Sequence, residues 1–166
     1  MQTRYPTLMI IIHWLVAILV LAAYITGGNP IKHEFEGQIH VATGMAIMAL
    51  FLIRLPVRLL SKKAIPEFQL PTWQAHLAKT VQWALYGCMI LIPFLGMLAL
   101  AEKTEQYMLF GMNIPMIKTD LGVDFGDIHE ALAQLFIGLA GVHAGAALLH
   151  HFVWKDGVLK SMSLHK

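Results

Sequence analysis

Four histidines of this sequence lie in or beside long apolar segments. His13 and His40 each fall within an apolar stretch, and His143 lies within residues 131–153, which contain no Asp, Glu, Lys or Arg. His129 stands just before that segment. Polar side chains are costly at membrane depth and need a partner there. The four histidines are therefore candidates for binding a ligand inside a membrane.

The spacing of the last two histidines indicates two layers of sites. Fourteen residues separate His129 from His143, which is nearly four helical turns, so both side chains project from almost the same face. The rise of an α-helix places them about 21 Å apart in depth. Ala133, Phe136 and Ala140 lie between them on that face. The two alanines would leave room there for flat rings.

Composition places these residues in an integral membrane protein. The chain has 166 residues, of which 57% are hydrophobic and 13% charged, a balance that is rare in soluble domains. Several apolar runs approach the roughly 20 residues that a helix needs to cross a bilayer. The predicted fold class is all-α, a membrane four-helix bundle forming a single domain over residues 1–166. The expected helices cover residues 8–26, 37–58, 77–101 and 128–153, each to within a few positions.

Local signals suggest how some of these segments begin and end. The first apolar run lacks an obvious small-residue cleavage site, so we expect a retained helix and not a signal peptide. Asp127 and Glu130 have the spacing of a capping box, which predicts Asp127 as the N-cap of the fourth helix. We expect His33 and His165 to be solvated loop and tail residues.

The basic residues predict how the bundle is oriented. Cytoplasmic flanks of membrane helices collect Lys and Arg, and here nine basic residues fall on one side and three on the other. Both termini are therefore expected in the cytoplasm. The outer side carries eight of the ten acidic residues, and its longest loop, residues 102–126, is expected to fold partly over the bundle. The three outer basic residues are Lys32, Lys103 and Lys118.

This orientation gives each histidine a depth. His40 and His129 fall in an outer layer, and His13 and His143 fall in an inner layer. Two facing imidazoles at each of two depths suit two six-coordinate b-type haems, because a porphyrin is a large apolar disc and histidine is a common axial ligand. We expect three nearby glycines to make further space for the rings: Gly44, Gly141 and Gly145.

The four histidines could have roles other than haem ligation. Each imidazole alone could simply hydrogen-bond to a neighbouring helix. A structural zinc site wants four ligands where each layer offers two, and a transporter usually wants an acidic residue deep in a span, which is missing here. The single cysteine, Cys88, and the lack of a C-x-x-C-H motif exclude covalent haem. The dispersed basic residues give no sign of nucleic-acid binding.

Longer motifs around these residues resemble the prokaryotic cytochrome b561 family. The resemblance implies haem ligands at His13, His40, His129 and His143, the same four that depth selects. It also implies a bacterial inner-membrane protein that passes electrons from superoxide, or another small periplasmic donor, to bound ubiquinone. Where the family commonly has a histidine in its third helix, this sequence has Gln82. The matching segments are RYPTLMIIIHWLVAILV (4–20), HVATG (40–44), RLPVR (54–58), IHEALA (128–133) and VHAGAALLHHFVWKDGVLKSM (142–162).

Four further residues are candidates for binding the cofactors or the acceptor. His150 is seven residues beyond His143 and shares its face, so it could bond a quinone carbonyl, a haem propionate or lipid headgroups. Arg4 and Arg54 lie where inner-haem propionates would emerge, and arginine binds carboxylates well. Both also suit a role as positively charged membrane anchors. Trp14 could pack on a haem edge or simply at the interface.

The sequence thus predicts a di-haem b membrane oxidoreductase, with no catalytic side chain singled out. Histidine at both axial positions leaves no vacant site for oxygen and favours outer-sphere electron transfer. The acidic outer face should repel an anionic donor unless one of the three outer lysines makes a local positive funnel. The alternative function is a haem-b anchor subunit that relays electrons from a partner dehydrogenase to quinone.

Overall fold

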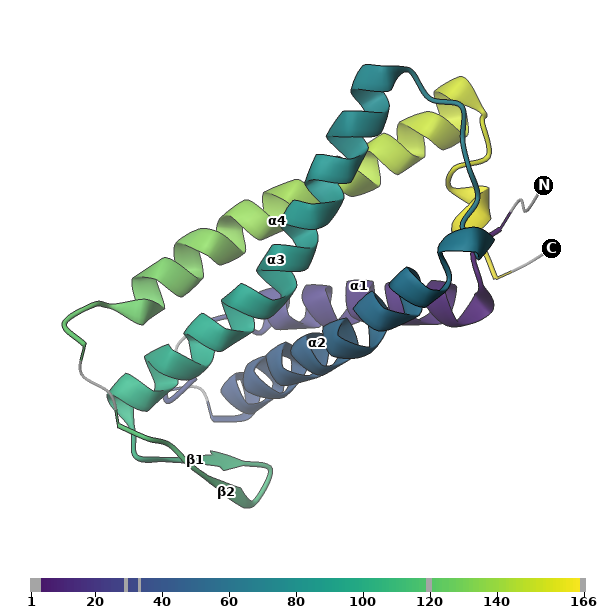
Figure 1. Ribbon diagram of the computed structural model, residues 1–166. Helices are drawn as coiled ribbons and strands as arrows, with labels where there is room; N and C mark the ends of the chain where they lie inside the picture. Colours follow the sequence, from purple (N-terminus) through teal and green to yellow (C-terminus); the bar gives the residue numbers. More distant parts are fainter. Residues whose placement is uncertain (1–3, 29, 33, 119–120, 165–166) are drawn as a thin grey trace.

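Four long helices dominate the molecule (Figure 1). The computed structural model describes residues 4–28, 30–32, 34–118 and 121–164, so the solvated positions expected for His33 and His165 lie outside the described residues. All four helices are long and apolar enough to cross a membrane, which confirms the predicted all-α membrane fold. The elements are α1 (Thr7–Ile25), α2 (Glu34–Leu60), α3 (Thr72–Lys103), the hairpin strands β1 (Gln106–Leu109) and β2 (Met112–Pro115), and α4 (Phe125–Leu149).

The helix ends differ from the sequence prediction in an informative way at α4. The N-cap is Asp124, whose carboxylate accepts a hydrogen bond of 3.1 Å from the backbone N–H of Asp127. The prediction that Asp127 is the N-cap is therefore wrong. Asp127 instead lies in the first turn, where its charge interacts favourably with the helix dipole. At α2, Pro56 lies inside a helix that continues to Leu60.

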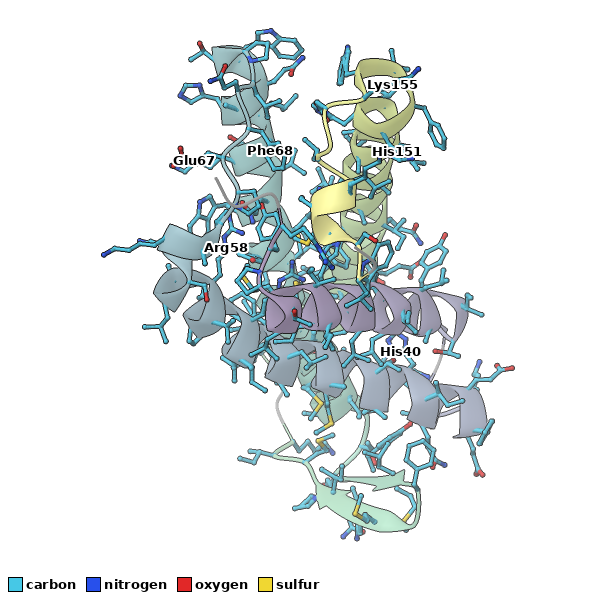
Figure 2. The ribbon with its side chains drawn as sticks, turned by 90° about the vertical axis from the view of Figure 1, so that its right-hand side faces the viewer. His40, Arg58, Glu67, Phe68, His151 and Lys155 are labelled. Carbon is cyan, nitrogen blue, oxygen red and sulfur yellow. The ribbon has the colours of Figure 1, made fainter. Side chains whose placement is uncertain are left out.

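The helices are arranged as two pairs. α1 packs against α2, α3 packs against α4, and α2 contacts α3. The two pairs diverge from the end that carries the β1–β2 hairpin towards the end where both chain termini lie (Figure 1). Figure 2 shows the same divergence from the side. We call these the hairpin end and the terminal end.

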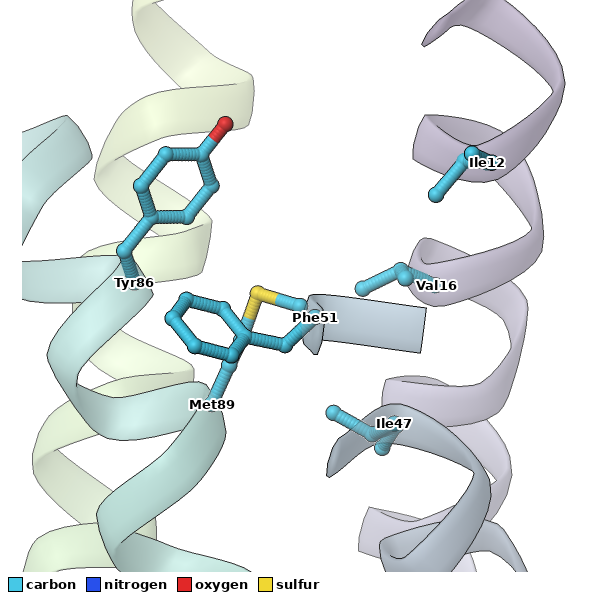
Figure 3. Packing of buried hydrophobic residues seen from close by; sticks show 6 residues of the cluster. All are labelled: Ile12, Val16, Ile47, Phe51, Tyr86 and Met89. Carbon is cyan, nitrogen blue, oxygen red and sulfur yellow. The ribbon is translucent and has the colours of Figure 1, made fainter. Parts of the chain in front are cut away.

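The main core lies where α1, α2 and α3 meet (Figure 3). Lipid tails are as apolar as these side chains, so the contacts stabilise the bundle mainly through close van der Waals packing. α4, which the structure describes completely, has no buried residue, although Phe136 packs against this core. The core residues are Ile12, Val16, Ile47, Phe51, Tyr86 and Met89.

A short hairpin folds part of the 102–126 loop against the bundle. Its two turn residues, Phe110 and Gly111, both have positive φ angles of 47° and 83°, as a two-residue hairpin turn of type I′ requires. The N–H of Phe110 donates to Gln38 Oε1 of α2 at 2.7 Å. Tyr107 and Leu109 are buried beside α2. This part of the 102–126 loop therefore covers the hairpin end.

At the terminal end the two chain termini are tied together. The N–H of Tyr5 donates to the carbonyl of Ser161 at 3.1 Å. The indole N–H of Trp14 donates to the carbonyl of Met162 at 2.9 Å, and the Arg4 guanidinium donates to the carbonyl of Ser163. These bonds hold the C-terminal segment across the start of α1.

Candidate functional site

Two histidine pairs connect α4 with the α1–α2 pair of helices. His40 of α2, labelled in Figure 2, faces His129 of α4 with ring centres 5.9 Å apart and ring planes at 79°. His13 of α1 faces His143 of α4 with ring centres 6.1 Å apart and planes at 76°. The structure therefore brings together the same two pairs that helix depth predicted.

These distances fit an iron atom held between two imidazoles. A metal–imidazole bond of about 2 Å, with each ring centre roughly 1 Å beyond its nitrogen, separates the ring centres by about 6 Å. A direct edge-to-face contact of two rings spans about the same range of distances. Ring spacing alone therefore does not identify a metal site, and the hydrogen bonds of the remaining ring nitrogens must decide.

The pair nearer the hairpin end is arranged for ligation. His40 Nδ1 lies 2.8 Å from the carbonyl oxygen of Ala23, and His129 Nδ1 lies 2.8 Å from that of Ile92. Carbonyls only accept, so each imidazole carries its proton on Nδ1 and has a free lone pair on Nε2. Such backbone partners orient metal-binding histidines and raise their basicity.

The positions of Ala23 and Ile92 in their helices explain why the two imidazoles can reach these carbonyls. Ala23 belongs to the last turn of α1, whose carbonyls have no partner within the helix. Ile92 lies one turn before Gly96 in α3, and a Cβ atom at Gly96 would lie 3.0 Å from His129 Cε1. Glycine is thus what allows the imidazole to approach the backbone of α3. Gly96 was not predicted from the sequence, because nothing nearby along the chain signals this contact.

At the pair nearer the terminal end, a ring nitrogen bonds an arginine instead of a backbone carbonyl. An Arg54 guanidinium nitrogen lies 2.9 Å from His13 Nδ1, and since arginine only donates, Nδ1 accepts. Arg54 is only 7% exposed, and within the described residues it forms no ion pair. Its guanidinium also lies 5.7 Å from the ring centre of Tyr86. A buried cation of this kind needs an anionic partner.

Three buried donors of the described residues lack any hydrogen-bond partner: Arg4 Nε, Arg54 Nε and the hydroxyl of Tyr86. A buried polar group without a partner costs about 1–3 kcal/mol. Guanidinium groups bind carboxylates in a bidentate manner, and the two propionates of a haem b are carboxylates. The donor set therefore fits haem at the His13–His143 pair. Both arginines were predicted from the sequence, whereas Tyr86 was not.

The space beside the histidines agrees only partly with the prediction. A Cβ atom at Gly44, one turn from His40, would meet only Pro93 at 4.0 Å. Gly141 and Gly145 are also open, but each is two residues from His143 and so lies about 200° around α4. They face away from the imidazole, and the expectation that they make room for a ring beside it is wrong.

The remaining candidates lie near the terminal end. The Trp14 ring is 5.7 Å from that of His13, while its N–H is engaged by Met162. His150 contacts the carboxylate of Asp156, a residue that was not predicted from the sequence. Gln82 accepts a hydrogen bond of 3.0 Å from Arg58 and so links α3 to α2.

Charges at the hairpin end are mixed. A surface hollow of about 440 Å³ follows the end of α3 and contains two lysines and two glutamates. Lys118 Nζ lies 3.8 Å from Glu105 Oε1, and both side chains are exposed. The expected positive funnel therefore has acidic neighbours at Lys103 and Lys118. Across the described ranges, no three His, Cys, Asp or Glu side chains converge as a zinc site requires.

Comparison with known sequences shows which proteins the chain resembles. The model of the prokaryotic cytochrome b561 family matches residues 4–163. The chain is 32% identical to a probable superoxide oxidase CybB of Yersinia pestis, over 98% of this chain and 97% of the relative. It is 30% identical to a cytochrome b562 of Cereibacter sphaeroides, over 97% and 96%. Cytochrome b561 homolog 1 of Escherichia coli K12 is 26% identical over 97% of both chains.

Proposed function

Because the chain belongs to the prokaryotic cytochrome b561 family, whose members are membrane electron carriers that bind haem b, we propose that it holds two haems b and passes electrons between them. His40 and His129 would ligate the haem nearer the hairpin end. His13 and His143 would ligate the haem nearer the terminal end. The observation that carries the proposal is that His40 and His129 face each other while Nδ1 of each bonds a backbone carbonyl, which leaves both Nε2 atoms free to ligate.

Each bound haem supplies a one-electron iron couple, and the protein sets how readily it is reduced. At the hairpin end, backbone carbonyls of Ala23 and Ile92 make the imidazoles more basic, which favours the oxidised iron. At the terminal end, the buried guanidinium of Arg54 favours the reduced state. We therefore expect electrons to move from the hairpin end to the terminal end.

Arg54, Arg4 and Tyr86 would bind the propionates of the haem at the terminal end. Their unpartnered donors support this role, as does the position of Arg54 beside His13. On haem binding, Arg54 would turn from His13 Nδ1 to a carboxylate, and the ring proton of His13 would move from Nε2 to Nδ1, which leaves the Nε2 lone pair free to ligate. Two histidine ligands at each site would leave no place for oxygen to bind, so the chemistry supplied there would be electron transfer alone.

Superoxide is the donor we propose, oxidised to O₂ by the loss of one electron, with ubiquinone as the acceptor. The name of the Yersinia pestis relative supports the donor. The count of nine basic residues against three supports termini in the cytoplasm and the hairpin end in the periplasm. The location that follows is the bacterial inner membrane.

A haem-b anchor subunit is the second candidate. The hairpin end presents exposed apolar side chains that could dock a dehydrogenase, namely Met108, Phe110, Met112 and Ile117. A partner that co-purifies with the protein and is lost from a Phe110→Ser variant would favour this function over a free-standing enzyme.

The direct test of the proposed function uses the purified protein. Pyridine haemochrome analysis should give two non-covalent haems b per chain. Superoxide should reduce them and a soluble ubiquinone analogue should reoxidise them. A yield of one haem per chain would contradict the di-haem arrangement, and haems that stay oxidised under a flux of superoxide would contradict the donor.

A further inference from the structure

The chain reverses sharply where α4 ends. A π-helical turn over His150–Trp154 is followed by Lys155 in the left-handed conformation, with φ of 55°, and by Gly157 with φ of 83°. Left-handed backbone is disfavoured for lysine. The reversal returns Asp156 to His150, whose carbonyl accepts from the Asp156 N–H at 3.4 Å.

This reversal brings the carboxylate of Asp156 into contact with the imidazole of His150. His150 Nδ1 contacts Asp156 Oδ2, and Asp156 Oδ1 accepts from the N–H of Val158 at 3.1 Å. The two side chains are 13% and 29% exposed. Burial alone would raise the pKa of Asp156, but the hydrogen bonds from His150 and Val158 outweigh it and hold the pKa below its usual value. The carboxylate is therefore ionised at neutral pH.

An ionised carboxylate fixes the state of the imidazole. It accepts the proton of His150 Nδ1, which leaves Nε2 as the atom that can take up and release a second proton. The Trp154 ring, 4.5 Å from that of His150, limits rotation of the imidazole. His150 is seven residues beyond His143 on nearly the same face, about 10 Å nearer the terminal end.

We propose that His150 and Asp156 form a proton-donating dyad for the quinone acceptor, with His150 as the donor and Asp156 as its positioning residue. This inference rests on the proposed function, in which electrons leave the protein at the terminal end. Electron transfer through haem carries no proton. A quinone reduced there must obtain its protons from a side chain or from water.

The reaction balances as follows. A quinone takes two electrons and two protons to become a quinol, and in the proposed function the electrons would reach it one at a time at the terminal end. At a carbonyl oxygen, the C=O π bond breaks as an O–H bond forms with the proton from His150 Nε2. Water at the protein surface then returns a proton to Nε2. The proton on His150 Nδ1 stays on that nitrogen throughout, hydrogen-bonded to the carboxylate of Asp156.

Other titratable side chains adjoin the dyad. His151, Lys155 and Lys160 line a neighbouring surface hollow of about 250 Å³, and Figure 2 labels two of them at the end of α4. The His151 ring packs edge-on against Phe152, with ring centres 4.8 Å apart. His151→Ala therefore makes a matched control, since it removes an adjacent imidazole that has no contact with Asp156 in the structure.

The test compares two acceptors on the purified holoprotein. Decylubiquinone takes up protons with its electrons, whereas ferricyanide takes up an electron alone. After reduction with dithionite, Asp156→Asn should slow reoxidation by decylubiquinone about tenfold or more and leave reoxidation by ferricyanide unchanged. The rate at which decylubiquinone reoxidises Asp156→Asn should also fall more steeply with rising pH than the same rate of the wild type. Asp156→Glu should restore much of the quinone rate, and His151→Ala should behave as wild type.

The outcomes distinguish a failure of the dyad from a failure of the proposed function. If Asp156→Asn keeps both haems but slows both acceptors equally, or neither, the contact merely closes the end of α4 and the dyad is wrong. If Asp156→Asn loses haem, His150→Gln provides the same comparison with the carboxylate in place, and equal rates with both acceptors would again overturn the dyad. A wild-type protein that ferricyanide reoxidises but decylubiquinone does not would overturn the proposed acceptor itself.

Discussion

Single residues decide how each imidazole is held, and Gly96 is the clearest case. Its missing side chain lets His129 reach the carbonyl of Ile92, which puts the proton on Nδ1 and frees Nε2. At the other pair, Arg54 approaches His13 and lacks an anionic partner among the described residues. The two pairs thus have opposite electrostatic surroundings, and this difference is what would give electron flow a direction.

Gly96→Ala should damage the haem nearer the hairpin end. The new Cβ atom would lie 3.0 Å from His129 Cε1, so the imidazole must move and lose its bond to Ile92. We expect a protein that retains about half of its haem, measured by pyridine haemochrome. Gly138→Ala is the control, because a Cβ atom there meets nothing within 4 Å and alanine favours a helix by roughly 0.5–1 kcal/mol. Full haem content in Gly96→Ala would contradict the close contact.

Arg54→Gln should lower the reduction potential of one haem. Removing a buried positive charge disfavours the reduced iron, and a change of about 1.4 kcal/mol corresponds to roughly 60 mV for one electron. A potentiometric titration should therefore show one component shifted down and the other unchanged. Arg58→Gln removes a neighbouring arginine that bonds Gln82 instead and should shift neither. Two unshifted components in Arg54→Gln would show that its charge does not act on a haem.

At the scale of elements, α4 contributes one histidine to each pair, while α1 and α2 contribute one each. The fourteen-residue spacing along α4 predicted that His129 and His143 share a face at two depths, and the depths of His13 and His40 in their own helices then predicted the pairing. The cap of α4 was mispredicted because Asp124 and Asp127 are both good caps and only the path of the loop selects between them. Gly96 and Asp156 were missed because their contacts depend on how helices cross and chains reverse.

The C-terminal segment that lies across the start of α1 gives a test at the same scale. Trp14 was predicted to pack on a haem edge or at the interface, and its N–H bonds the carbonyl of Met162. Trp14→Phe keeps an aromatic ring but removes the bond, so it should cost about 1 kcal/mol of unfolding free energy and leave both haems bound. Thermal unfolding followed in the Soret band would measure this. A loss of haem without a loss of stability would instead assign Trp14 to the cofactor.

At the scale of the whole molecule, the even number of spans places both termini at one end, and Figure 1 shows them together. The sequence predicts which end faces the cytoplasm only through its lysines and arginines, because a helical bundle packs equally well either way up. In the proposed function, donor and acceptor approach opposite ends, which links topology to the direction of electron flow.

Cysteine labelling in intact cells would test this topology. In a Cys88→Ala background, Met112→Cys on the exposed hairpin should react with a membrane-impermeant maleimide added outside the inner membrane. Lys160→Cys, also exposed, should react only after the membrane is opened. The reverse pattern would place the hairpin in the cytoplasm and contradict superoxide entry from the periplasm.

The central claim, that four histidines form two separate haem sites, is tested most directly by the spectra and haem content of four single variants. His40→Ala and His129→Ala should lose the same spectral component, and His13→Ala and His143→Ala should lose the other, because the two layers are about 21 Å apart and cannot exchange ligands. A double variant within one pair should add little, whereas a double variant across the pairs should abolish both signals. If His13→Ala and His40→Ala removed the same component, the pairing across α4 would be wrong.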